Sequence, residues 1–181
     1  MEYLEGQSLR NMLRKLRIDR QFLPIRIAIQ FTLQILQALE YAHRWVTHRD
    51  LKPENIMVVP GEKIKVLDFG LAIAVEESIQ QATQPSASSQ NRPNASNNQS
   101  GPSTNHIHSS QGQTLIGTYG YASPEQKKKW PADARSDLYT VGLILYELLS
   151  LRSPVDKYVP LMQRRNDVSP SINEVLNKAL A

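Results

Sequence analysis

Two acidic side chains and an amide stand at a spacing that suits phosphate and metal chemistry. Residues 48–55 read H-R-D-L-K-P-E-N, and a D-F-G tripeptide follows at 68–70. The amide oxygen of Asn55 and the carboxylate of Asp68 are hard oxygen ligands of the kind that Mg²⁺ accepts alongside waters and substrate phosphates. Asp50 stands a turn earlier, where its carboxylate can accept a proton from an attacking hydroxyl group.

A β-hairpin is predicted between these two segments, and it would bring them together. Residues 56–59 are apolar, residues 63–67 alternate polar and apolar side chains, and a P-G-E turn signal separates the two runs. The first strand would begin just after Asn55 and the second would end just before Asp68. We therefore expect both side chains to face a common space.

The octapeptide, the hairpin and the D-F-G together resemble the catalytic core of eukaryotic-like serine/threonine protein kinases of the bacterial type. A lone D-F-G is a common tripeptide, and a lone histidine is more often a packing residue, so the combination carries the resemblance. It implies that Asp50 is the catalytic base and that Asn55 and Asp68 bind Mg²⁺. It also implies that Lys52 neutralises the transferred phosphate. A lysine at this position of the loop is the form found in serine/threonine kinases.

Further roles follow from the same resemblance. The chain opens with M-E-Y-L-E-G, which resembles the kinase hinge, so Glu2 and Leu4 would bind the adenine of ATP through their backbone. A terminus without fixed structure is the alternative interpretation of this opening. Lys52 and Met57 complete the implied ATP contacts. The implied cofactors are ATP and Mg²⁺.

The end of the activation segment is the next stretch that resembles the family. Residues 117–125 read G-T-Y-G-Y-A-S-P-E, where Thr118 would bond near the base and Ser123 replaces the usual alanine, a departure that suggests a bacterial origin. The arginine that normally pairs with the glutamate at the position of Glu125 lies in closing helices that this sequence does not include. We therefore expect Glu125 to lack its usual partner.

Structural and regulatory roles are implied for several other residues. His48 and Phe69 would stack in the regulatory spine, next to Gly70, and Asp137 would bond the backbone of the catalytic loop. Arg49 resembles the arginine that binds a phosphorylated activation segment. Thr114 is the favoured phosphorylation site, with Ser109 and Ser110 as rivals and an unmodified segment as the alternative.

Four helices are predicted. Ser8 would cap a short helix over residues 8–13, and Pro24 would start a long one with apolar side chains on one face. Ser136 and Asp137 open a nearly all-apolar helix over residues 138–149. The last helix begins at Ser169-Pro170. The fold class is therefore the C-terminal lobe of a protein kinase, mainly α with a small β-hairpin at the active site.

Three regions divide the chain. Residues 1–77 hold the hinge, catalytic loop and D-F-G, and residues 114–181 hold the end of the activation segment and the remaining, truncated lobe helices. Between them, residues 78–113 are rich in Ser, Asn, Gln and Pro, so we expect a disordered insertion that buries too little apolar surface to offset its chain entropy.

Composition excludes several classes of protein. The 181 residues suit one domain, and the absence of cysteine excludes disulfides and cysteine-based sites. The net charge of +4 is scattered, and the run at 127–129 is interpreted as a solvated face, with a nucleic-acid patch as the weaker alternative. The most apolar stretch, 138–149, is too short to span a bilayer. We expect a cytoplasmic protein with no membrane segment and no nucleic-acid partner.

Three functional hypotheses remain open, because the sequence holds no glycine-rich loop, strand lysine or helix glutamate of an N-terminal lobe. The first is a serine/threonine kinase recorded in part, transferring the γ-phosphoryl group of ATP to protein hydroxyls. Its partners would be protein substrates and an upstream or self-phosphorylating kinase. The second is an inert lobe that binds partners, and the third is a decayed fragment.

Overall fold

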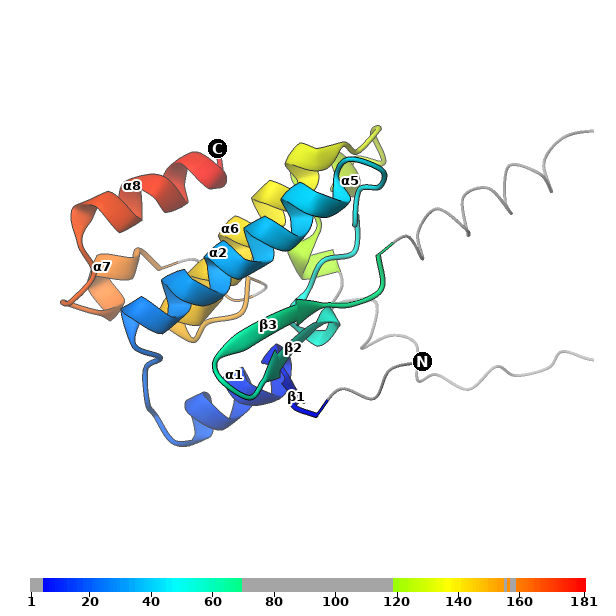
Figure 1. Cartoon of the computed structure of the whole chain (residues 1–181). Helices are drawn as coiled ribbons and strands as arrows, with labels where there is room; N and C mark the ends of the chain where they lie inside the picture. Colours follow the sequence, from blue (N-terminus) through cyan, green and yellow to red (C-terminus); the bar gives the residue numbers. More distant parts are fainter. Residues whose placement is uncertain (1–4, 70–118, 155, 157–158) are drawn as a thin grey trace, which may run out of the picture.

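Two long helices lying side by side form the centre of the molecule (Figure 1). The computed structural model describes residues 5–69, 119–154, 156 and 159–181. The central helices are α2 (Ile25–Ala42) and α6 (Ala134–Ser150). The mainly helical architecture predicted from the sequence is confirmed.

Helix α2 forms where the apolar and polar positions separate. The helix starts at Pro24 as predicted, and Pro24 is its N-cap residue. The apolar face is buried, with 7% exposure or less for Ala28, Phe31, Ile35, Leu39 and Ala42. The polar side of α2 also supports the sheet, because the Gln34 amide group accepts from Ile64 N (2.9 Å) and donates to the Glu62 carbonyl (3.0 Å). These two hydrogen bonds fix the hairpin against α2.

The sheet has three strands, one more than the hairpin predicted from the sequence. Strands β2 (Ile56–Val59) and β3 (Lys63–Val66) pair antiparallel with Ile56 opposite Val66. The extra strand is β1 (Gln7–Ser8), which pairs with β2 on its other edge. Gly6 lets β1 approach, because a Cβ atom there would lie 2.4 Å from the Val58 carbonyl oxygen.

Helix α1 (Leu9–Ile18) follows β1 without a break and is longer than the predicted segment. Its cap is as predicted, since the Ser8 hydroxyl accepts a hydrogen bond from Asn11 N (3.2 Å). Leu9 and Leu13 are fully buried and anchor the helix in the core. Helix α1 is thereby tied to both the sheet and the central helices.

Helix α6 begins earlier than its apolar run, because Asp133 rather than Ser136 is its N-cap and accepts from Arg135 N (2.8 Å). The helix ends at Ser150, and its C-cap residue Leu151 has a left-handed backbone. Nearly every side is covered, and α8 (Pro170–Ala179) packs so closely that a Cβ on Gly142 would lie 3.0 Å from the Ala179 side chain. The shorter helices are η1 (Pro53–Asn55), α5 (Pro124–Lys127) and α7 (Leu161–Arg164).

Several predicted features fall outside the described residues. They are the hinge contacts of Glu2 and Leu4, and Gly70, Thr114, Thr118, Ser109, Ser110 and the insertion over residues 78–113.

Candidate active site

The loop between α2 and β2 brings the amine of Lys52 and the amide of Asn55 into contact with Asp50. Lys52 Nζ lies 2.7 Å from Asp50 Oδ2. The Asn55 side-chain amide donates to the Asp50 carbonyl oxygen (3.0 Å) and also approaches Asp50 Oδ2 (3.4 Å). Asp50 keeps 42% of its side chain exposed. A carboxylate oriented by two neighbours and still open to solvent is suited to accept a proton from a substrate.

The hairpin places Asn55 and Asp68 at one end of the sheet, as the sequence predicts. Leu67 N donates to the Asn55 carbonyl (2.8 Å), which extends the pairing of β2 and β3 by one step. Asp68 is exposed and has a left-handed backbone, with φ of 60°. Asp68 therefore follows directly after the end of the strand pairing that starts at Asn55.

An amide oxygen and a carboxylate, as Asn55 and Asp68 offer, are of the ligand type that Mg²⁺ accepts. In the described ranges no group of three or more His, Cys, Asp or Glu side chains is arranged to hold a metal ion. Mg²⁺ needs only one or two protein oxygens when waters and substrate phosphates complete its octahedron. Since the Asn55 amide nitrogen is bonded to Asp50, its amide oxygen is the group left to face a metal ion.

The loop that carries Asp50 is held in place by a buried carboxylate on α6. Asp137 is 1% exposed and accepts hydrogen bonds from His48 N (2.8 Å) and Arg49 N (2.9 Å). His43 Nε2 lies 2.7 Å from the same carboxylate. Three partners satisfy a group that would otherwise be costly to bury, and they fix a loop in which Arg49 has a φ of 61°.

His48 connects the loop held by Asp137 to the D-F-G segment. Its ring is 1% exposed, contacts Phe69 with 4.9 Å between ring centroids, and places Nε2 2.9 Å from the Leu67 carbonyl. The structure therefore brings together the two aromatic side chains that the sequence analysis paired. Lys52 and Met57, the implied ATP contacts, lie on the loop and on β2 of the same site.

Helix α5 contacts the catalytic loop through a residue that the sequence analysis missed. Gln126 Nε2 donates to the Arg49 carbonyl (2.7 Å), while the Gln126 side chain also caps its own helix with Ser123. The S-P-E-Q sequence is a capping box, and this is the signal that could have placed Gln126. Helix α5 is thus tied to the backbone of the residue before Asp50.

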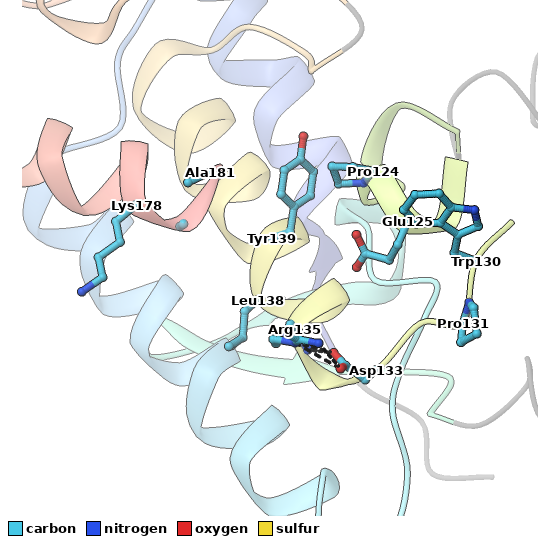
Figure 2. Close-up of a pocket in the computed structure, with 11 residues that line it drawn as sticks. Pro124, Glu125, Trp130, Pro131, Asp133, Arg135, Leu138, Tyr139, Lys178 and Ala181 are labelled. Carbon is cyan, nitrogen blue, oxygen red and sulfur yellow. Dashed lines mark hydrogen bonds and ion pairs between the residues drawn. The ribbon is translucent and has the colours of Figure 1, made fainter. Parts of the chain in front are cut away.

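Glu125 has a hydrogen-bond partner of another kind than the arginine that the sequence analysis expected it to lack. The Ser136 hydroxyl donates to its carboxylate, and this hydrogen bond lowers the pKa of Glu125. Glu125 lines a hollow of about 730 Å³ between α5, α6 and the end of α8, together with Trp130 and Tyr139 (Figure 2). Burial raises the pKa of the Tyr139 phenol in this hollow.

A second buried carboxylate on α6 was not predicted from the sequence. Glu147 is fully buried and accepts from Arg10 Nη1 (2.8 Å), Arg17 Nη2 and the Tyr121 hydroxyl. Arg10 also donates to Glu54 of η1 (2.8 Å) and to the Tyr121 hydroxyl (2.7 Å). Burial, followed by the charge of Glu147, raises the pKa of Tyr121. These contacts join α1, η1, α6 and the segment before α5.

Comparison with known proteins agrees with this geometry. The chain matches the family model described as protein kinase domain over residues 1–178. It is 41% identical over 155 residues to the probable serine/threonine-protein kinase SCO3848 of Streptomyces coelicolor, covering 85% of this chain and 18% of that protein. It is 33% identical to the serine/threonine-protein kinase PknB of Mycolicibacterium smegmatis, covering 100% of this chain and 26% of that protein.

Solved structures show the same fold. The kinase domain of Mycobacterium tuberculosis PknI superposes with a TM-score of 0.63 at 25% identity, covering 100% of this chain and 56% of that chain. A single mutant of the same domain gives a TM-score of 0.65 at 24% identity, with the same coverage.

Fold, site and comparisons define the class of protein: the chain belongs to the protein kinase family. Within it, the chain is of the bacterial, eukaryotic-like serine/threonine type. The chain spans about a fifth to a quarter of the length of these two curated relatives. Among the described residues, no helix has the length and apolar character needed to cross a membrane.

Proposed function

We propose that this chain carries the catalytic half of a serine/threonine protein kinase that transfers the γ-phosphoryl group of ATP to protein hydroxyls. The observation that supports this most is Asp50, which is open to solvent and held by Lys52 Nζ at 2.7 Å in a loop that Asp137 fixes. Phosphoryl transfer needs mainly positioning and electrostatic stabilisation, and these contacts support such a role for the loop.

Each residue of the loop has a part in the proposed reaction. Asp50 orients the substrate hydroxyl and takes its proton, while the oxygen forms a bond to the γ-phosphorus and the bond from that phosphorus to ADP breaks. Lys52 donates to the transferred phosphoryl oxygens and offsets their charge. Asn55 and Asp68 are the residues that would hold Mg²⁺, which neutralises phosphate charge when bound.

ATP recognition is proposed for residues around the same loop. Glu2 and Leu4 would bind adenine through their backbone groups, and Met57 of β2 would contact the adenine ring. Thr118 would bond near Asp50 and favour serine and threonine as acceptors. The substrates are proteins with exposed serine or threonine, as is general for this family.

The test is phosphoryl transfer from radiolabelled Mg·ATP to a serine/threonine peptide library by the full 181-residue chain. Asp50→Asn should reduce the rate by about 10²–10⁴-fold, the usual contribution of a general base. The matched control is Asp19→Asn, which changes an exposed aspartate at the end of α1. Transfer that survives in Asp50→Asn, or no transfer by the unaltered chain, would contradict the proposal.

Regulation by phosphorylation is a separate part of the proposal. A phosphate on Thr114, or on its rivals Ser109 and Ser110, would bind Arg49 and order the segment, since a phosphate adds charge and three acceptor oxygens. The phosphate would come from an upstream kinase or from a second copy of this one. Phosphopeptide mapping of active protein checks this, and an unmodified Thr114 there would remove it from the mechanism.

A further inference from the structure

A basic hollow lies apart from the candidate active site and shares no lining residue with it. The hollow has a volume of about 410 Å³ and is lined by Arg17, Arg20, Phe22, Leu151 and Arg164, which we call the arginine pocket. Its residues come from the end of α1, the loop before α2, the end of α6 and the end of α7. Two regions far apart in sequence, residues 17–22 and 151–164, therefore converge on one cavity.

The charge of the arginine pocket is strongly one-sided. Three guanidinium groups line it, and none of its lining residues is acidic. The buried carboxylate of Glu147 pairs with Arg17 and also with Arg10. Asp167, a carboxylate on the neighbouring loop, is bound by Arg165. Arg20 and Arg164 therefore carry the excess positive charge.

The guanidinium groups differ in how firmly they are fixed. Arg17 is held, because Nε donates to the Leu151 carbonyl (2.7 Å) and Nη2 donates to Glu147. Arg164 has a buried Nε with no hydrogen-bond partner within the described part of the chain.

The lining indicates the chemical class of the ligand. Guanidinium groups bind phosphate oxygens in pairs through their planar fork of donors, while the Phe22 ring and the Leu151 side chain offer apolar wall next to them. Such a mixture suits a phosphate carried on a short aliphatic side chain. We propose that the arginine pocket binds phosphoserine or phosphothreonine in a peptide segment.

Two sources could supply such a segment, and both are chemically the same to the pocket. One is this chain itself, whose residues 78–113 are rich in serine and threonine. The other is a phosphorylated protein, the product class of the protein kinase family. The inference adds a binding site to the proposed function, and its test measures binding in the absence of ATP, so it stands or fails without phosphoryl transfer.

The experiment is fluorescence anisotropy with the full chain and labelled peptides. One peptide covers residues 104–113 of this chain with phosphate on Ser109, and another is an unrelated glycine-alanine peptide with one phosphothreonine. Each is compared with its unphosphorylated form. The phosphorylated forms should bind at least about tenfold more tightly, and more weakly as salt rises, because charge-assisted hydrogen bonds dominate.

The variant is Arg20→Gln with Arg164→Gln, and its matched control is Arg26→Gln with Arg44→Gln, which removes the same charge from exposed positions on and after α2. The pocket variant should lose about tenfold or more in affinity for phosphopeptides, and the control less than about twofold. Circular dichroism and the melting temperature establish that both variants are folded.

The outcomes separate the sources. Preference for the 104–113 peptide assigns the pocket to this chain's own segment, and equal binding of both phosphopeptides assigns it to phosphoproteins in general. Inorganic phosphate that competes at the same concentration as the peptides would overturn the peptide assignment. Equal binding of unphosphorylated peptides, or equal losses in the two variants, would overturn the pocket itself.

Discussion

Helix α6 carries two buried carboxylates that are satisfied in opposite ways. Asp137, in its first turn, is bonded by two backbone N–H groups of the catalytic loop and by His43. Glu147, near its last turn, is bonded by side chains of Arg10, Arg17 and Tyr121. Their exposures are 1% and 0%. One carboxylate fixes a loop, and the other joins separate elements.

The difference shows what each carboxylate does for the protein. Backbone donors have one geometry, so Asp137 specifies the conformation of residues 48 and 49 next to Asp50. Charged side chains are longer and adjustable, so Glu147 stabilises the assembly of α1 with α6 rather than a local conformation. Disturbing the first should harm the site, and disturbing the second should harm stability.

The largest effect is expected for Glu147→Ala. The substitution leaves the Arg10 and Arg17 guanidinium groups without their carboxylate, and breaking a buried ion pair from one side typically costs about 3–5 kcal/mol. Urea unfolding of the full chain measures the change in the free energy of unfolding. The control is Glu40→Ala, an exposed glutamate on α2. A loss below about 1 kcal/mol would show that the network contributes little.

Asp137→Ala should destabilise by roughly 2–4 kcal/mol, because it leaves the His48 and Arg49 N–H groups buried without an acceptor. Asp137→Asn keeps one acceptor oxygen and should cost less, yet still lower the rate of phosphoryl transfer through the displaced loop. Thermal melting and the transfer assay, run on both variants, check this. An unchanged melting temperature in Asp137→Ala, or a Glu147→Gln variant with the greater loss of transfer per folded molecule, would reverse the comparison.

The smallest effect is expected for Tyr121→Phe, which removes one hydrogen bond to Glu147 at a cost of about 1 kcal/mol near neutral pH. Burial and Glu147 raise the pKa of Tyr121 in the folded state, so the folded chain keeps a proton that the unfolded chain loses above about pH 10. The stabilisation from the neutral phenol is complete below that pH and declines above it.

The stability difference between the unaltered chain and Tyr121→Phe should therefore shrink as pH rises above about 10. Denaturant titrations of both proteins from neutral to alkaline pH measure it. A difference that stays constant across that range would mean that the phenol titrates alike in the folded and unfolded chain.

Much of the fold is predictable from local patterns. The hairpin, the caps at Ser8 and Ser169, the long helix after Pro24 and the apolar helix after Ser136 all follow from periodicity and turn chemistry within a few residues. The contact of Asp137 with the loop was implied by a family motif. These features need no knowledge of which distant segments meet.

The features that the sequence analysis missed depend on contacts between segments that are far apart in sequence. Strand β1 has two residues, too few for an alternating pattern. Glu147 reads as a polar interruption in an apolar run, and its partners Arg10 and Arg17 stand 137 and 130 positions away. The arginine pocket likewise combines the ends of α1, α6 and α7. Only tertiary packing decides that these charges are neighbours.

The hydrogen bonds from the backbone of residues 48 and 49 to Asp137 also have a consequence for synthesis of the protein. Arg49 and the carboxylate that holds its backbone are separated by 88 positions. At roughly 5–20 residues per second on the ribosome, Asp137 is added about 4–18 s after the loop. During that interval the newly made loop lacks its support, so the left-handed backbone at Arg49 is set only after α6 leaves the exit tunnel and docks.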